Sequence, residues 1–487
     1  MAVAMTTTEE GGAGVGDSPM PHVVMVSFPA QGHLNPLLRL AKRVAAKGLL
    51  VTLCSTDDIA RRIAAAASTS VGALADPTRV GRGFIRFEFF SDGIAPDDPV
   101  RHLDFDFFMA ALRSAGPPAL AALVRRQVVP VACIVSNPYV PWVLDVAADL
   151  GLPRGVLWVQ SAAVFSIYYH YHHALATFPS EDNPDVTVQL PGLPPLRPED
   201  LPTFLLWTSP YQYLKIVILD QFSNLSNASW VFANTFDELE HEAIEAISHH
   251  QVIIPIGPLV DPPAEEGGSK EIGGGEIKAD LFKAADESIQ WLARHPPRSV
   301  VYVSVGSVVV LTEEEMEEVA WGLKQTGQPF LWVVRSDARE RLPAGFAEAV
   351  EAEGIGMLVE WSPQERVLEH QAVACFLTHC GWNSTMEALT AGVPVVAYPQ
   401  FGDQVPDAKM LAEACGVGVR LPAPATRAEL QRCVKAVTEG ETAEAIRRRA
   451  SEWKEAAVKA VSEGGSSDRH IQAFVDDLTK RAARPTN

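Results

Sequence analysis

The sequence predicts an α/β protein with two doubly wound domains, each built around a parallel sheet. Short runs rich in Val, Ile and Leu alternate with helical segments along most of the chain, a pattern typical of parallel strands that helices cover on both faces. The alternation stops in a stretch rich in Gly, Glu, Lys and Pro and then starts again. Such a stretch indicates a linker or a surface loop between two units.

The expected strands fall into two groups. Those of the first half are residues 23–28, 50–54, 84–89, 133–135, 155–158 and 230–233. Those of the second half are residues 300–305, 330–334, 356–359, 375–377 and 393–397. Because the strands alternate with helical segments, each group predicts an open sheet with helices on both faces.

These groups set the domain boundaries that we expect. An N-terminal domain spans residues 21–257 and a C-terminal domain spans residues 286–465, with a linker or mobile loop at 258–285. Residues 1–20, rich in Gly, Thr, Glu and Ala, are expected to form a disordered tail. Residues 466–487 are expected to form a helix that packs back on the N-terminal domain.

The charge of the chain limits its partners. Lys and Arg number 40 and Asp and Glu number 60, which gives a formal net charge of −20. This excess would repel phosphate backbones and anionic lipids, so neither nucleic acid nor a membrane surface is an expected partner. No uninterrupted apolar stretch reaches the roughly 18–20 residues of a membrane span, and residues 1–20 lack the pattern of a secretory signal. We expect a cytoplasmic protein that acts as a monomer.

The cysteines indicate no metal site and no disulfide framework. They are scattered, mostly within apolar runs, with no CxxC pair and no metal-ligand spacing against His: Cys54, Cys133, Cys375, Cys380, Cys415 and Cys433. We expect buried, reduced thiols.

Two loops are placed to bind ligands, because ligands of open α/β sheets lie beyond the carboxyl ends of the strands. One loop is PAQGHLNP at residues 29–36, in which Asn35 and Pro36 are expected to be the N-cap and first residue of a helix. The other is THCGWNS at residues 378–384, which opens a second helix. With one loop in each domain, the two are expected to face a shared cleft.

Residues 361–404 form the most specific motif, WSPQERVLEHQAVACFLTHCGWNSTMEALTAGVPVVAYPQFGDQ. This segment resembles, over its full length, the 44-residue donor-binding signature of the plant family 1 UDP-glycosyltransferases. A looser resemblance extends from about residue 21 to the C-terminus and includes PAQGHLNP and VVYVSVGSV at residues 300–308. It implies a GT-B fold, in which two Rossmann-like domains face a cleft. It also implies UDP-glucose as the donor substrate, no cofactor, no metal and inversion at the anomeric carbon.

The same resemblance assigns residues to the base, ribose and sugar of the donor. Trp361 matches the platform on which the uracil stacks, with Gln364 beside it. Glu387 is expected to accept hydrogen bonds from the two ribose hydroxyls. Asp403 and Gln404 match the pair that reads the sugar, and Gln at the second position favours glucose over galactose.

A second set is expected around the diphosphate. His379, Trp382, Asn383 and Ser384 lie at the start of a helix, where unpaired backbone N–H groups favour an anion, although N-capping alone would also explain the Asn and Ser. Ser307, in the turn after residue 305, is expected to approach the phosphates as well.

His33 matches the catalytic base of the family. A neutral imidazole, with a pKa near 6.5, can accept a hydroxyl proton as the oxygen attacks the anomeric carbon. Most relatives pair this base with an Asp about a hundred residues later, but this chain has Asn137 at the matching position. An amide can orient the imidazole but cannot stabilise its charge; in serine proteases the comparable change costs about ten-thousand-fold. Asp145 is an alternative partner.

The weaker base favours an acceptor that ionises without help. A carboxylic acid, with a pKa of about 4, is already an anion at neutral pH, whereas a phenol, with a pKa of about 10, is not. SNPYVPWVLDVA and LWVQSAAVFSIYYHY also resemble the branch that esterifies hydroxycinnamic, benzoic, gallic or indole-3-acetic acid with glucose. Glucose-ester formation on a small aromatic acid is therefore the first hypothesis. Glucosylation of phenols such as flavonoids and non-catalytic binding of a UDP-sugar are the alternatives. The candidates for lining the acceptor pocket are Phe105, Phe107, Phe108, Trp142, Phe165 and Tyr168.

Overall fold

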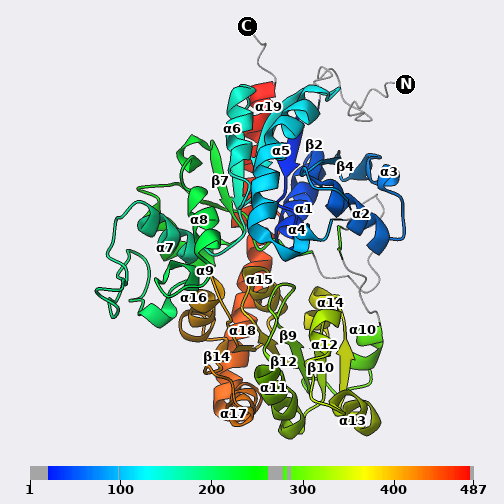
Figure 1. Cartoon of the computed structure of the whole chain (residues 1–487), viewed down its shortest axis with the longest axis vertical. Coiled ribbons are helices and arrows are strands. Elements are labelled where there is room, and N and C mark those ends of the chain that lie inside the picture. The colour runs from blue at the N-terminus through cyan, green and yellow to red at the C-terminus, as the bar shows by residue number, and fades with distance from the viewer. Residues whose placement is uncertain (1–19, 97, 262–276, 278, 282–286, 483–487) are drawn as a thin grey trace.

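The structure is a computed structural model of the chain, and it describes residues 20–96, 98–261, 277, 279–281 and 287–482. The expected tail, apart from residue 20, and most of the expected linker lie outside these residues. Two lobes stack along the long axis of the molecule, each with a central sheet and flanking helices (Figure 1). The fold class is α/β, as predicted.

The upper lobe contains a sheet of eight described strands. Their order is β3 (Thr78–Val80), β4 (Gly83–Phe90), β2 (Leu50–Thr56), β1 (His22–Val26), β5 (Val131–Ser136), β6 (Arg154–Trp158), β7 (Trp230–Ala233) and β8 (Ile254–Pro255). All neighbours pair in parallel except β3 and β4, which are antiparallel.

The helices that accompany this sheet come from the same part of the chain. They are α1 (Gln31–Ala46), α2 (Asp57–Ala66), α3 (Val71–Leu74), α4 (Val100–Leu103), α5 (Phe105–Arg125), α6 (Trp142–Asp149), α7 (Ala162–His172), α8 (Gln212–Asp220) and α9 (Asp237–Ile247). Three short 3-10 turns lie between them: η1 (Pro198–Asp200), η2 (Thr203–Leu205) and η3 (Leu225–Asn227).

The lower lobe contains a sheet of six described strands, all parallel. Their order is β11 (Gly356–Val359), β10 (Phe330–Val333), β9 (Val300–Ser304), β12 (Val373–Thr378), β13 (Val395–Ala397) and β14 (Gly418–Arg420). Numbered within the lobe, this order is 3-2-1-4-5-6, which is that of the Rossmann fold.

The remaining helices follow the connector, which is the segment 258–285 between the two domains. They are α10 (Glu287–Leu292), α11 (Glu313–Thr326), α12 (Ser336–Arg339), α13 (Phe346–Glu353), α14 (Gln364–Glu369), α15 (Trp382–Ala391), α16 (Gln404–Lys409), α17 (Arg427–Thr438), α18 (Gly440–Val461) and α19 (Ser466–Ala482). A π-helical turn, η4 (Met410–Ala414), follows α16 directly.

Each strand expected from the sequence is present, with ends displaced by at most two residues. Strands β3, β8 and β14 were missed, because each has only two or three residues and therefore carries too few side chains to show a pattern. The six cysteines are buried and unpaired, as predicted.

The strand order creates one switch point in each sheet. In the upper sheet, β1 lies between β2 and β5, and in the lower sheet β9 lies between β10 and β12. The chain leaves adjacent strands at these points toward opposite sides, so the loops after β1 and β5, and after β9 and β12, border a crevice. Both loops singled out in the sequence follow such strands.

Helix α5 has the length and mean hydropathy of a membrane-spanning helix, by length and composition only. Its buried side chains, Phe108, Leu112, Leu120 and Leu123, pack into a core with β1 and α6. This packing accounts for its apolar composition, since a core helix of a globular domain passes the same test.

Helix α19, drawn in red in Figure 1, returns to the upper lobe although it ends the described chain. Its apolar face joins the core between α1 and β5. The ring of Phe474 lies edge-on to Trp230 and Phe232, with centroid distances of 5.1 and 4.9 Å. The last described helix therefore packs on the N-terminal sheet, although it follows the C-terminal domain in the sequence.

We expect Phe474→Ala to lower the free energy of unfolding by about 3–5 kcal/mol, the range for deleting a buried Phe side chain. Phe474 is 3% exposed, so truncation leaves a cavity against β7. Urea unfolding followed by tryptophan fluorescence would measure the change, with Lys480→Ala on the exposed face of α19 as the control. Equal stability of the two variants would contradict this account of α19.

Candidate active site

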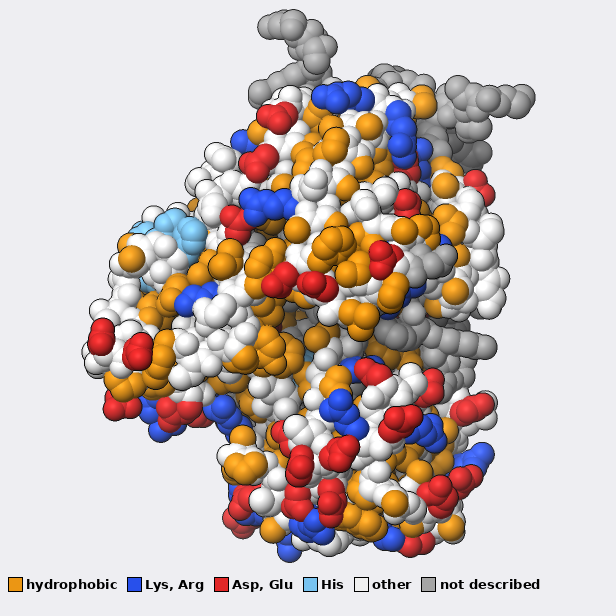
Figure 2. All heavy atoms as spheres, in the orientation of Figure 1, with side chains coloured by type: hydrophobic (Ala, Val, Ile, Leu, Met, Phe, Trp, Pro, Cys, Tyr) orange, Lys and Arg blue, Asp and Glu red, His pale blue; other side chains and the backbone are white. Residues whose placement is uncertain are grey.

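A cavity of about 1950 Å³ lies between the lobes, at the carboxyl ends of the strands of both sheets. In the space-filling view, hydrophobic side chains gather where the lobes meet, and acidic and basic side chains are interspersed over the lower lobe (Figure 2). The cavity wall includes these predicted residues: His33, Ser307, Trp361, Gln364, His379, Trp382, Asn383, Ser384, Glu387, Asp403 and Gln404. Asn137 lies behind the wall and is 2% exposed.

The first predicted loop is shorter than expected, because α1 already begins at Gln31 and Pro36 lies inside the helix. The predicted start at Asn35 was therefore wrong. Proline has no N–H, so Pro36 leaves the carbonyl of Gly32, four residues earlier, without its helical partner. That carbonyl accepts a hydrogen bond of 2.8 Å from Asn383 Nδ2 of the lower lobe. The proline thus frees an acceptor for a contact between the domains.

His33 stands in the first turn of α1, at the switch point of the upper sheet. Its ring lies edge-on to Phe28 and Tyr139, with centroid distances of 5.1 and 5.0 Å. Burial among these rings lowers the pKa of His33 to about 3, because desolvation disfavours the charged imidazolium. Its Nδ1 is buried without a hydrogen-bond partner among the described residues. The imidazole is therefore neutral at physiological pH.

Asn137 does not orient the imidazole, and this expectation was wrong. Its Oδ1 accepts from the backbone N–H of Phe28 at 2.9 Å, and its Nδ2 donates to Ser27 Oγ at 3.2 Å and to the backbone carbonyl of His33 at 2.9 Å. The amide joins the loops after β1 and β5, a role that needs a donor and an acceptor on one side chain. It therefore positions the backbone of His33 only.

Asp145, the alternative partner, faces elsewhere. Its carboxylate accepts from Asn224 Nδ2 at 3.0 Å, and the side chain is exposed on α6. No carboxylate among the described residues is hydrogen-bonded to the ring of His33.

The loops after β9 and β12 meet at His379. Gly306, in the loop after β9, has a φ of +79°, and a Cβ added there would lie 2.6 Å from His379 Nε2. Gly381 is equally close, since its added Cβ would lie 2.4 Å from the same atom. Burial lowers the pKa of His379 to about 4. The two glycines thus admit a neutral imidazole to the cavity wall, beside Ser307.

Helix α15 begins at Trp382, so the predicted helix start is correct. The indole of Trp382 points away from the cavity into the core and donates from Nε1 to the backbone carbonyl of Asn234 at 2.7 Å. Its side chain therefore links the lobes. What this residue can offer a ligand is the N–H of the first helical turn, which has no partner within the helix.

The Gln364 side chain organises the part of the wall next to Trp361. Gln364 Nε2 donates to Ser384 Oγ at 2.8 Å and to Glu387 Oε2 at 2.7 Å, and Gln364 Oε1 accepts from Tyr302 Oη at 3.0 Å. Trp361 is partly exposed at the cavity, which suits a stacking platform. The residues predicted for base and ribose therefore line the same cavity.

Asp403 is the N-cap of α16 and Gln404 is its first residue, and both line the cavity. Burial raises the pKa of Asp403 to about 6, and a hydrogen bond from Gln160 opposes this shift. Gln404 Oε1 accepts from the backbone N–H groups of Gln400 and Phe401, at 3.0 and 3.3 Å. These bonds fix the Gln404 amide at the wall.

The acceptor side of the cavity is only partly as predicted. Of the six aromatic candidates, Phe105 lines the cavity; Phe108, Trp142, Phe165 and Tyr168 are buried in the core, and Phe107 is exposed. Apart from Tyr302, Trp361 and Trp382 on the donor side, the Phe, Tyr and Trp residues that line the cavity are Phe28, Phe105, Tyr139, Phe204, Tyr211, Tyr213 and Phe401. Most of them come from loops, whose course a residue pattern does not specify.

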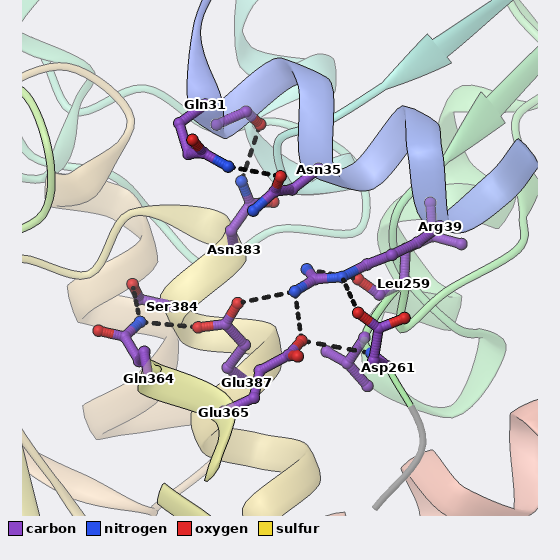
Figure 3. Close-up of polar contacts among 12 residues, drawn as sticks. Gln31, Asn35, Arg39, Leu259, Asp261, Gln364, Glu365, Asn383, Ser384 and Glu387 are labelled. Carbon is purple, nitrogen blue, oxygen red and sulfur yellow. Dashed lines mark hydrogen bonds and ion pairs between the residues drawn. The ribbon is translucent and has the colours of Figure 1, made fainter. Parts of the chain in front are cut away.

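Sequence reasoning also missed Arg39, which lies between Leu38 and Leu40 of α1. Its guanidinium reaches the lower lobe, where it contacts Glu365 and lies 3.5 Å from Glu387 Oε1 (Figure 3). The Arg39 side chain is 8% exposed. A buried arginine with carboxylate partners in the other domain is a feature that only the packed structure reveals.

The chain matches known families in both halves. Residues 275–461 match the family described as UDP-glucoronosyl and UDP-glucosyl transferase, and residues 21–80 match the glycosyltransferase N-terminal domain. A gallate 1-beta-glucosyltransferase of Quercus robur is 46% identical and aligns over 97% of this chain and 92% of its own length. The chain belongs to the UDP-glycosyltransferase family. Another UDP-glycosyltransferase, the cinnamate beta-D-glucosyltransferase of Fragaria ananassa, is 44% identical over 96% of this chain and 84% of its own length.

Solved structures of UDP-glycosyltransferases share the arrangement of the two lobes. Os79 from O. sativa, in complex with UDP, superposes with a TM-score of 0.80 at 30% identity and covers 94% of this chain and all of its own. Phytolacca americana UGT2, complexed with UDP-2-fluoro-glucose and pterostilbene, gives a TM-score of 0.75 at 27% identity, with the same coverage. The GT-B fold is therefore confirmed, and the chain is a transferase that uses a UDP-sugar.

We expect Trp361→Ala to weaken UDP binding by about 5- to 150-fold, which corresponds to the roughly 1–3 kcal/mol of one base stacked on an aromatic ring. Isothermal titration calorimetry with UDP would measure the change. The control is Trp321→Ala, since Trp321 is also partly exposed and in the same lobe but packs on Phe346. Unchanged affinity in Trp361→Ala would exclude Trp361 as the base platform.

Proposed function

We propose that this enzyme transfers glucose from UDP-glucose to the carboxylate of a small aromatic acid and forms a 1-O-glucose ester. The observation that carries this proposal is the environment of His33. The Asn137 amide is hydrogen-bonded to the backbone of Phe28 and His33 and to Ser27 Oγ, and no carboxylate among the described residues is hydrogen-bonded to the His33 ring. Since a carboxylic acid is ionised at neutral pH, the reaction needs no strong base.

The chemistry can be written without a proton transfer. One oxygen of the acceptor carboxylate attacks the anomeric carbon of glucose, and the bond between that carbon and the oxygen of the β-phosphate breaks. UDP leaves with the electron pair, and attack from the opposite face inverts the configuration. The N–H groups at the start of α15 and the neutral imidazole of His379 are suited to stabilise the departing diphosphate. His33 then has the task of positioning the acceptor.

The relatives support the same acceptor class. Gallate 1-beta-glucosyltransferases occur in Quercus robur and Punica granatum, and the latter are 45% identical to this chain. The Fragaria ananassa relative is named for cinnamate. Gallate and cinnamate are both small aromatic carboxylates.

The cavity also suits a flat, apolar acceptor. Phe28 and Tyr139 flank His33, and Phe204 and Tyr211 pack around Phe401 with centroid distances of 5.9 and 6.0 Å. Aromatic walls bind aromatic rings through area and through edge-to-face contact. On the donor side, we assign Trp361 to the uracil, Glu387 to the ribose, and Asp403 and Gln404 to the glucose.

Glucosylation of a phenol is the second candidate, because the neutral imidazole of His33 can still accept a proton. Within the described part of the chain, no carboxylate is hydrogen-bonded to this ring to stabilise the resulting charge, so we expect the glucosylation of a phenol to be the slower reaction.

Given UDP-glucose and 4-hydroxycinnamate, which has both a carboxylate and a phenol, the enzyme is expected to form a product that mild alkali cleaves to the free acid. Chromatography before and after alkali would show this. Cinnamate, which lacks the phenol, should be accepted, and methyl 4-hydroxycinnamate, which lacks the free carboxylate, should react poorly. An alkali-stable product would instead identify a phenolic glucoside, and release of no UDP with any acid would leave only a UDP-sugar binder.

His33→Ala is expected to separate the two chemistries. Ester formation on cinnamate should fall by no more than about tenfold, since no proton is removed, whereas any phenol reaction should fall by about 10²- to 10⁴-fold, as expected for the loss of a general base. Initial rates of UDP release with each acceptor would measure both. Loss of both reactions to the same degree would show that His33 does more than position the carboxylate.

A further inference from the structure

One side chain of the acceptor domain extends into the donor site. Arg39 leaves the middle of α1 and points at the carboxylates of Glu365 on α14 and Glu387 on α15 (Figure 3). Its other contacts hold it on the upper lobe: Nη1 donates to the backbone carbonyl of Leu259 at 3.0 Å, and Nε lies 3.7 Å from the carboxylate of Asp261. It is a fixed cation at the boundary of the two domains.

The carboxylates around Arg39 would otherwise repel each other. Burial raises the pKa of both carboxyl groups, that of Glu365 to about 8, and the negative charge of Glu387 contributes to the raised pKa of Glu365. Arg39 opposes both shifts, because a nearby cation favours the ionised form.

Other charged or titratable groups also face this cluster. Asp261, on the connector, adds a negative charge and is itself paired with Lys42 Nζ at 3.0 Å. Arg43 is directed at backbone carbonyls of residues 256–260. Tyr302 is hydrogen-bonded to Gln364 and remains neutral, since burial raises its pKa. Among the described residues, Arg39 is therefore the cation in direct contact with Glu387.

The geometry also fixes the Glu387 carboxylate in orientation. Oε1 lies 3.5 Å from Arg39 Nη2, while Oε2 accepts from Gln364 at 2.7 Å. An ionised carboxylate accepts at both oxygens and can receive two hydroxyl groups, whereas a protonated one gives up acceptor capacity to its own O–H.

We propose that Arg39 is a positioning residue of the donor site, which keeps Glu387 ionised and oriented to receive the two ribose hydroxyls of a nucleoside diphosphate sugar. This inference rests on the proposed role of Glu387 in the donor site. It makes donor binding a property of both domains, because the cation that prepares the C-terminal site is anchored in the N-terminal domain.

Arg39→Met keeps much of the side-chain length and removes the charge. In this variant the cation that opposes the raised pKa of Glu387 is absent, so the protonated form of Glu387 is favoured. Titration calorimetry with UDP is expected to give a Kd at least about tenfold above that of the native chain near pH 6.5, and the ratio should shrink near pH 8.5. Adding Glu365→Gln to Arg39→Met should restore part of the affinity, because the competing carboxylate is gone.

The matched control is Lys409→Met, which removes a different buried cation that joins the lobes. Lys409 Nζ lies 3.1 Å from Asp200, and its side chain is 10% exposed, close to the 8% of Arg39. Its UDP affinity should stay within about twofold of the native value at both pH values, and so should that of Glu365→Gln alone. These two variants also decide the outcome if Arg39→Met does not fold: a Glu365→Gln chain that loses UDP binding would overturn the proposal.

The proposal is also overturned if Arg39→Met binds UDP as the native chain does, or if its loss is the same at both pH values and Glu365→Gln restores nothing. Either result would leave Arg39 as a contact that only holds the domains together. A native chain that binds no UDP would instead refute the proposed function.

Discussion

Helix α1 is the element on which the site depends, because it carries three groups that face the cavity or the other lobe. Gly32 offers a carbonyl, freed by Pro36, to Asn383; His33 enters the cavity; and Arg39 reaches Glu387 about two turns later. Gly32 and Arg39 are seven residues apart and therefore share the helix face toward the lower lobe, and His33 lines the cavity from the first turn. One helix thus fixes the position of the acceptor side of the cavity relative to the donor side.

The site uses neutral imidazoles and has no strong base among the described residues. Burial keeps both His33 and His379 uncharged. The Asn137 amide is hydrogen-bonded to backbone groups of Phe28 and His33 and not to the His33 ring. Such a site has little capacity to stabilise a new positive charge on the base. It suits an acceptor that brings its own negative charge, and this charge is what distinguishes a carboxylate from a phenol at neutral pH.

Several of the contacts between the lobes are specific polar ones. Asn383 donates to Gly32 O, the indole of Trp382 to Asn234 O, and Lys409 pairs with Asp200. Buried polar groups are costly unless they are paired, so each of these contacts favours one docking of the domains over others. The cavity between the lobes keeps its shape for the same reason.

The sequence by itself determined the two α/β units, the strand positions and the donor-side residues. Hydrophobic periodicity is a local property, and the 44-residue segment carries its residues on one strand–loop–helix series, so both can be recognised without the fold. It could not predict the start of α1, where Pro36 marks a helix interior. Only the tertiary structure decided that Asn137 serves the backbone, that Trp382 faces the other lobe and that Arg39 pairs with Glu387. The physical reason is that these contacts join residues more than a hundred positions apart, and which polar groups are left to pair depends on how the two domains pack.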